Sequence, residues 1–133
     1  MSEVRLRVEV DVNPTEDPAR VRYAVENIFG KLKLEEKPLH RGSLLIGCAR
    51  GMESMTEFGN LLRRERIRDA ARAVLFRGLK ENTVSFCLNK QVAFAGHVSF
   101  CEPIAESPLG PIRVEIEGKN LTELINWIAP RTA

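Results

Sequence analysis

The sequence predicts an α+β fold in which one sheet, mixed but largely antiparallel, carries helices packed on one face. Six segments alternate apolar and polar side chains, as half-buried strands do, and four others repeat apolar residues at helical spacing. Several strands follow one another directly instead of alternating with helices, which is typical of α+β and not of doubly wound α/β proteins. We therefore expect the order β-α-β-β-α-α-β-β-β-α within a single domain that spans residues 1–133.

The composition is that of a soluble globular protein. The 133 residues are 44% hydrophobic and 29% charged, and every apolar run is too short to cross a bilayer. The first residues lead directly into a charged strand pattern, without the apolar core of a signal peptide. Cys48, Cys87 and Cys101 form no CxxC motif and, as an odd number, suggest no disulfide framework. We expect a cytoplasmic protein.

The N-terminal elements have the clearest signals. Residues 4–12 alternate apolar with charged side chains and predict a half-buried strand. Asp17 followed by Pro18 is typical of an N-cap and a first helical position, and Gly30 is typical of a helix end. The helix between them has its apolar residues on one side: Val21, Ala24, Val25, Ile28 and Phe29.

The next segments predict two strands and the start of a helical region. Residues 31–35 are expected to form a short strand, 38–42 a turn and 43–49 a central, apolar strand. Ser54 and Glu57 stand three residues apart, which predicts a capping box at the start of the next helix.

The C-terminal part returns to the sheet. Strands are expected over residues 84–88, 92–100 and 112–117. Residues 106–111 contain two prolines and a glycine and predict a rigid loop. Asn120 and Glu123 predict the capped start of a last helix, whose apolar residues are Leu121, Leu124, Ile125 and Ile128.

Residues 61–80 form the most unusual segment, an amphipathic helix rich in arginine. Residues 63–80 contain seven basic and two acidic side chains and so have a net charge of +5, whereas the rest of the chain has a net charge of −3. Such a concentration of positive charge on a slightly acidic body favours a polyanionic partner such as nucleic acid.

The arginines of this helix fall on a separate face from its apolar residues. Arg64, Arg68 and Arg72 recur at i, i+4 and i+8 beside an apolar stripe of Ile67, Ala70, Ala71 and Val74. The arginine stripe is either a surface that faces phosphates or an ordinary solvated face with i, i+3 acid–arginine pairs.

The same helix cannot continue unchanged towards its start. There it would place Arg63 in the apolar stripe, so we expect a break near residues 63–66 or a buried acidic partner. On this interpretation Arg63, Arg66 and Asp69 are structural charges at the break.

No catalytic, cofactor or metal motif is recognisable. Two glycines bracket four residues as in a P-loop, but Cys48 and Ala49 replace the lysine and the hydroxyl that phosphates and magnesium require. His97 and Cys101 would stand about 13 Å apart along a strand, too far to share a metal ion. We expect no cofactor, no metal and no enzymatic activity.

Asn89-Lys90-Gln91 is a compact polar group that either contacts phosphates and base edges or forms a turn between strands. Residues 96–100 match only the end of an RNA-recognition motif, whose upstream half fails at 93–95. The first strand has no aromatic side chain for base stacking. Any RNA should therefore be bound mainly through its backbone charge and shape.

Four stretches of the chain together resemble one family. They are Val-Asn-Pro-Thr-Glu-Asp-Pro at 12–18, Leu-Arg-Arg-Glu-Arg-Ile-Arg-Asp-Ala-Ala-Arg at 62–72, Leu-Asn-Lys-Gln at 88–91 and Glu-Ser-Pro-Leu-Gly-Pro-Ile at 106–112. In this order they are similar to motifs of a family of small archaeal proteins of uncharacterised function, described as predicted RNA-binding proteins and once proposed to be associated with the exosome. The resemblance covers nearly the whole chain.

The resemblance implies an α+β fold similar to that of the ribosomal protein that binds 5S rRNA, and a homodimer. Glu65 departs from the family, in which many members carry glutamine at this position, and its negative charge weakens the case for a phosphate-binding helix.

We thus predict a non-catalytic RNA-binding module. Its phosphate contacts are expected at Arg64, Arg68 and Arg72, with Asn89 and Lys90 as second contacts. The alternative is a homodimeric structural or assembly protein whose arginine-rich helix binds acidic surface on a partner or on its own twin, because arginine is also favoured at interfaces. An enzyme with its site in the 107–111 loop is the third possibility.

Overall fold

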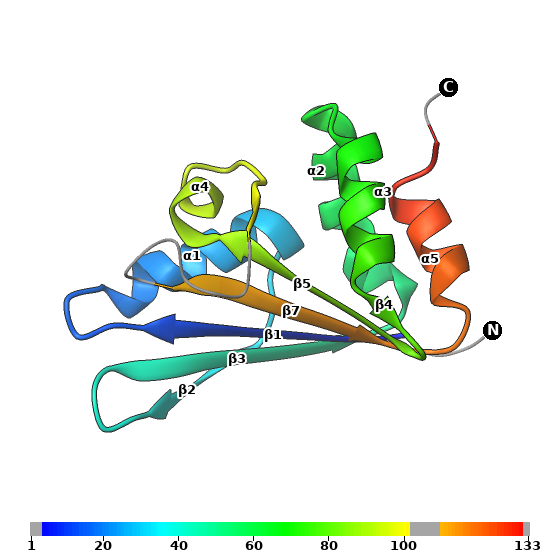
Figure 1. Cartoon of the computed structure of the whole chain (residues 1–133). Helices are drawn as coiled ribbons and strands as arrows, with labels where there is room; N and C mark the ends of the chain where they lie inside the picture. Colours follow the sequence, from blue (N-terminus) through cyan, green and yellow to red (C-terminus); the bar gives the residue numbers. More distant parts are fainter. Residues whose placement is uncertain (1–3, 102–109, 132–133) are drawn as a thin grey trace.

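One sheet with helices on a single face makes up the computed structural model, which describes residues 4–101 and 110–131 (Figure 1). Within these ranges the sheet has seven strands, and every strand pair is antiparallel. The predicted α+β fold with helices on one face is therefore confirmed, and the described sheet is antiparallel throughout instead of mixed.

The strands are β1 (Arg5–Val12), β2 (Leu34–Pro38), β3 (Ser43–Arg50), β4 (Leu79–Lys80), β5 (Thr83–Asn89), β6 (Phe100–Cys101) and β7 (Pro111–Glu117). Their order across the sheet is β2-β3-β1-β7-β5-β4, and β6 pairs with β5 farther along the same strand. The first and last long strands are thus neighbours at the centre, and β5 carries two very short partners.

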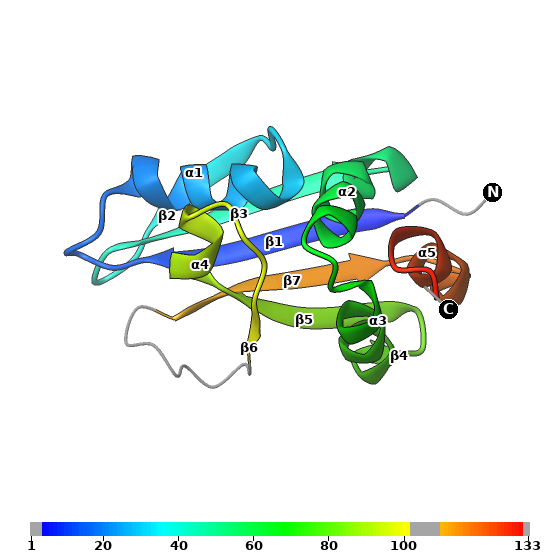
Figure 2. The ribbon, with the colours of Figure 1, turned by 90° about the horizontal axis from the view of Figure 1, so that it is seen from above.

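The helices are α1 (Pro18–Phe29), the 3-10 helix η1 (Met52–Met55), α2 (Thr56–Arg64), α3 (Arg68–Arg77), α4 (Lys90–Phe94) and α5 (Leu121–Ile128). Figure 2 shows that α1 and α4 cover one half of the sheet, whereas α2, α3 and α5 gather over the other half. No helix in the described part of the chain is long and apolar enough to cross a membrane.

The core lies between the sheet and these helices. Alternate residues of β1, including Leu6, Val8 and Val10, are buried beneath them. Phe58 of α2 is fully buried and stacks on Phe86 of β5, with ring centroids 5.5 Å apart. This contact fixes α2 on the sheet and so determines where the arginines at its end lie.

The predicted start of α1 is confirmed. The Asp17 Oδ1 atom accepts a hydrogen bond from the Ala19 N–H at 2.9 Å, Pro18 is the first helical residue, and Gly30 follows the helix at φ 75°. The predicted capping box at Ser54 is wrong, because Ser54 Oγ donates to the carbonyl of Gly51, the residue before η1, at 2.7 Å. Asn120 stands at the predicted N-cap of α5, but its side chain makes no cap bond.

The predicted strand over 31–35 is displaced to Leu34–Pro38. Leu34 lies opposite Gly47, where a Cβ atom would come within 2.5 Å of the Leu34 side chain. A side chain at position 47 would therefore have to displace the end of the Leu34 side chain. Pro38 belongs to the strand and not to the turn, which is compatible with proline because β2 is an edge strand.

The predicted strand over 92–100 is wrong. The Asn89 Oδ1 atom accepts a hydrogen bond from the Val92 N–H at 2.9 Å and caps α4, which ends before Gly96 at φ 89°. Only Phe100–Cys101 pairs with β5. A short alternating run does not distinguish a strand from one capped helical turn. Most of the predicted 106–111 loop lies outside the described residues, and Pro111 already belongs to β7.

Candidate nucleic-acid interface

The predicted break in the arginine-rich helix is confirmed, and it lies at residues 65–67, between α2 and α3. Arg66 has φ 59°, its N–H donates to the Arg63 carbonyl, and the Ile67 N–H donates to the Leu62 carbonyl, both at 3.1 Å. These two bonds are those of a Schellman motif, which ends a helix with one left-handed residue. We call residues 63–68 the arginine turn.

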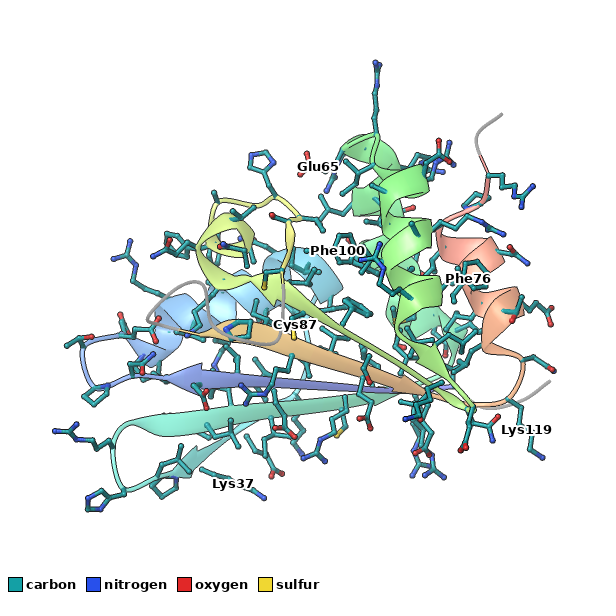
Figure 3. All side chains as sticks on the ribbon, viewed as in Figure 1. Lys37, Glu65, Phe76, Cys87, Phe100 and Lys119 are labelled. Carbon is teal, nitrogen blue, oxygen red and sulfur yellow. The ribbon has the colours of Figure 1, made fainter. Side chains whose placement is uncertain are left out.

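Glu65 uses its carboxylate to hold the arginine turn against the segment after α4. Its Oε1 atom lies 2.9 Å from His97 Nδ1 and accepts a hydrogen bond from the Val98 N–H at 3.2 Å (Figure 3). One of the two acidic side chains in the basic segment is therefore directed away from the arginines.

The three predicted phosphate contacts do not form a continuous stripe. Arg64 is the exposed last residue of α2, and Arg68 is the half-buried first residue of α3. Arg72 is held by its own helix and by α5, because its Nη1 atom donates to the Ala129 carbonyl at 3.2 Å and its Cζ atom lies 4.9 Å from the centre of the Phe76 ring.

The arginine turn presents its charge to solvent. Arg63, Arg64 and Arg66 are exposed, and Arg63 donates a hydrogen bond to Asn60 Oδ1 at 3.1 Å. In the described ranges, Arg64, Arg66 and Arg68 form no ion pair. Asp69 is exposed as well, so the expected structural charges at the break are not buried.

Asn89 and Lys90 lie over the other half of the sheet and serve the fold. Asn89 caps α4, and Lys90 is 5% exposed, with its Nζ atom 2.7 Å from the Asp11 carbonyl and 3.0 Å from Glu16 Oε1. This placement argues against a phosphate contact through Lys90.

Glu16 is the partner that holds Lys90. Burial disfavours its ionised form, but hydrogen bonds from the backbone and side-chain nitrogens of Asn13, together with Lys90, outweigh burial and lower the pKa of Glu16 below its ordinary value. The ionised Glu16 carboxylate therefore helps to tie the end of β1 to α4 through Lys90.

The sheet face opposite the helices, which we call the open face, carries balanced charge. Arg113 lies 3.2 Å from Asp11 and 3.6 Å from Glu9, and Arg7 also pairs with Glu9. None of the exposed large hydrophobic residues in the described chain belongs to β1, β3, β5 or β7. In the described chain, most of the open face thus offers a polyanion paired cations and no exposed aromatic platform, and Lys37, opposite Leu44 on the edge strand β2, is an exposed cation without an ion pair.

Two hollows border the arginine-rich helices. The larger, about 710 Å³, extends from β1 and β7 across β5 to α3. Its cations Arg7 and Arg113 are paired with acids, whereas Arg77 forms no ion pair within the described residues. The smaller, about 240 Å³, lies between α2 and α5 and is lined by Arg63, Arg68 and Trp127. The smaller one combines two arginines that form no ion pair within the described residues with an aromatic ring, Trp127, that is 49% exposed.

Trp127 is the residue that the sequence reasoning missed. It is 49% exposed on α5, whose four predicted apolar residues are all buried. Position 127 lies outside that apolar spacing, and this signal was available because an aromatic off the buried stripe must face solvent. In the parts of the chain that the structure describes, no cluster of three metal-ligating side chains occurs.

Comparison with known proteins finds a matching family model and similar sequences. A family model described as RNA binding matches residues 5–118. A UPF0201 protein from Pyrobaculum arsenaticum is 43% identical, over 97% of this chain and 91% of its own length. Another from Sulfurisphaera tokodaii is 41% identical, over 97% of this chain and 89% of its own.

Solved structures show the same fold. The crystal structure of a UPF0201 protein from Methanococcus jannaschii has a TM-score of 0.85 and 35% identity, covering 97% of this chain and 95% of that one. A DUF54 protein from Methanothermobacter thermautotrophicus has a TM-score of 0.66 at 18% identity, covering 97% of this chain and 99% of that one, and shares the fold alone.

Proposed function

This chain belongs to the UPF0201 family, and on that premise we propose that it is a non-catalytic RNA-binding protein that contacts the phosphate backbone through its arginine turn. The description of the family model as RNA binding supports the class of ligand. The position of the interface is an inference from the charges of this chain.

One observation supports that position: arginines that form no ion pair within the described residues are concentrated where α2 ends and α3 begins. Residues 63–72 hold five arginines and two acids, and Glu65 is already bound to His97. Arg68 also stands at the first position of α3, where the helix dipole disfavours a cation unless an anion is near. A phosphate at this end would relieve that unfavourable charge.

We propose that Arg64 and Arg68 bind phosphates directly. Arg72 would contribute only the guanidinium donors that its bond to the Ala129 carbonyl leaves unused. Asn89 and Lys90 are not part of the proposed surface, because both side chains are engaged within the fold.

The test measures the affinity of a labelled, mixed-sequence single-stranded RNA for the double variant Arg64→Glu/Arg68→Glu. We expect a loss of at least about tenfold, since each reversal replaces a phosphate contact with a repulsion. Arg72 stays intact in this variant because its replacement would also disturb α5.

A matched control variant has the same net charge as Arg64→Glu/Arg68→Glu. Lys37→Glu/Arg41→Glu reverses two exposed cations in β2 and in the turn that follows it, on the far edge of the sheet (Figure 3). This control should retain most of the affinity. Equal losses in both double variants would show that net charge alone, and not the arginine turn, drives binding.

A homodimeric assembly protein is the second candidate, and the exposure of the open face favours it. No described helix covers this face, which carries cations and acids in cross-strand pairs and half-buried Leu44 and Ile46. Such a surface can be complementary to a second copy of itself. Light scattering after size exclusion would then give twice the 15.0 kDa chain mass, and Ile46→Glu would restore the monomer. Association with the exosome and likeness to the 5S rRNA-binding ribosomal protein stay predictions.

A further inference from the structure

We propose that the hollow between α2 and α5 is a subsite for one unpaired nucleotide of the bound RNA, with the base on Trp127 and the phosphate on Arg63 and Arg68. This inference rests on the proposed RNA binding and adds a selectivity for single strands. It also assigns a binding role to Arg63, which the sequence marked as structural.

Trp127 has the exposure that a stacking platform needs. About half of its surface, 49%, is open to solvent, whereas its neighbour Ile128 is buried in the core. Covering an exposed indole with a flat base removes apolar surface from water and tolerates any base sequence, because every base has a π-face.

The polar side of the hollow is arranged for a phosphate and a base edge. The Arg63 Nη2 atom donates to Asn60 Oδ1 at 3.1 Å, which steadies the guanidinium beside the hollow and leaves the Asn60 Nδ2 group as a donor. Arg68 lines the same hollow from α3. Two guanidinium groups that form no ion pair within the described chain are the expected partners for one phosphate.

The hollow is large enough to hold part of one nucleotide. Its volume of about 240 Å³ lies below the roughly 300–1,000 Å³ that usually encloses a drug-sized ligand, so a nucleotide, which is of similar size, would be only partly enclosed. Gly59 lines it as well, and a Cβ atom there would stand 3.6 Å from Ile128, so the missing side chain leaves part of the space open. A base stacked inside a duplex cannot offer its face to Trp127, so only an unpaired base fits.

The chain contains a single tryptophan, so its intrinsic fluorescence reports on this subsite directly. The experiment titrates the full chain with a mixed-sequence single-stranded RNA of about twelve nucleotides, and with the fully paired duplex of the same sequence. We expect saturable quenching by the single strand. The duplex should bind through the arginine turn and leave the fluorescence essentially unchanged.

Variants separate stacking from charge. By anisotropy of the labelled RNA, Trp127→Ala should lose about 5- to 150-fold in affinity for the single strand, the usual effect of removing one stacking aromatic, and little for the duplex. Tyr23→Ala is the matched control, because Tyr23 is 54% exposed on α1 and contacts only the edge of Phe94 among described rings. Arg63→Gln/Arg68→Gln should weaken the quenching titration while thermal unfolding stays near that of the wild type.

The outcomes distinguish the two proposals. RNA binding with unchanged tryptophan fluorescence, and with equal affinities for wild type and Trp127→Ala, would overturn the subsite and leave the proposed function standing. Equal quenching by the duplex would overturn the selectivity for unpaired bases. Absence of binding to either RNA would contradict the proposed function, and the subsite with it.

Discussion

Arg64 and Arg72 carry the same guanidinium in different surroundings. Arg72 donates to the Ala129 carbonyl and lies over Phe76, so part of its charge holds α5 against α3. Arg64 is exposed at the end of α2 and forms no ion pair in the described chain. Helical spacing placed both in one stripe, and only their tertiary neighbours separate a packing arginine from one available to a ligand.

The surroundings of Lys90 also depend on tertiary neighbours, although the sequence alone assigns this residue to the surface. It is buried because α4 turns its side chain under the end of β1, where the Asp11 carbonyl and Glu16 receive it. The polar triplet 89–91 was therefore a helix start with a buried ion pair, a possibility that local composition does not reveal.

Glu16 gives a prediction about pH. Its pKa in the folded protein is lowered from an ordinary 4.5, so it stabilises the fold fully above about pH 4.5, and this contribution is lost as the pH falls through the lowered value. Denaturation of the wild type between pH 7 and pH 3 should show this loss. Glu16→Gln should cost about 1–3 kcal/mol at pH 7, since it leaves the buried Lys90 ammonium without its ion pair, and should show a shallower acid dependence. Identical pH profiles for the two proteins would contradict the assignment.

At the scale of elements, the break between α2 and α3 is what exposes the arginines. A straight helix would have carried Arg63 into the apolar stripe, and that physical conflict made the break predictable from sequence. Its exact form was not predictable, because the left-handed position of the Schellman motif is occupied by Arg66 where glycine is the usual signal.

This geometry predicts the effect of replacing Arg66. Arg66→Gly removes the steric cost of a side chain at positive φ, but glycine also adds conformational entropy to the unfolded chain. The net effect should be a rise of up to about 1 kcal/mol in the free energy of unfolding. Arg66→Val should lower it by about 1–2 kcal/mol, because a β-branched side chain disfavours positive φ. Urea denaturation measures both. A more stable valine variant would show that the turn does not hold its left-handed residue.

Strands and helices with long periodic patterns were predictable, and short ones were not. The alternation in β1 and the helical spacing in α1 extend over enough residues to exclude other structures. Residues 92–100 alternate too briefly to exclude the capped turn of α4, and the bounds of β2 follow from its pairing with β3, which the local sequence does not reveal. Trp127 could have been placed outside the buried stripe, whereas its proximity to Arg63 and Arg68 requires the tertiary packing of α2 on α5.

At the scale of the whole molecule, the open face and the helical side differ in how their charges are paired. On the open face Arg5, Arg7 and Arg113 are paired with acids and Lys37 is an exposed cation at the edge, so the attraction of this face for a polyanion is small. On the helical side, α2, α3 and α5 gather over one half of the sheet (Figure 2), and Arg63, Arg64, Arg66 and Arg68 lie where α2 ends and α3 begins. A near-neutral chain with a net charge of +2 can therefore present a strongly positive site locally.

The salt dependence of RNA affinity tests this central claim most directly. For single strands, the slope of log affinity against log salt is about −0.7 for each phosphate neutralised, so Arg64→Gln/Arg68→Gln should make the slope shallower by about 1.4. Lys37→Gln/Arg41→Gln should keep the wild-type slope. A slope that stays at the wild-type value in the first variant, or becomes equally shallow in both, would contradict phosphate binding at the arginine turn.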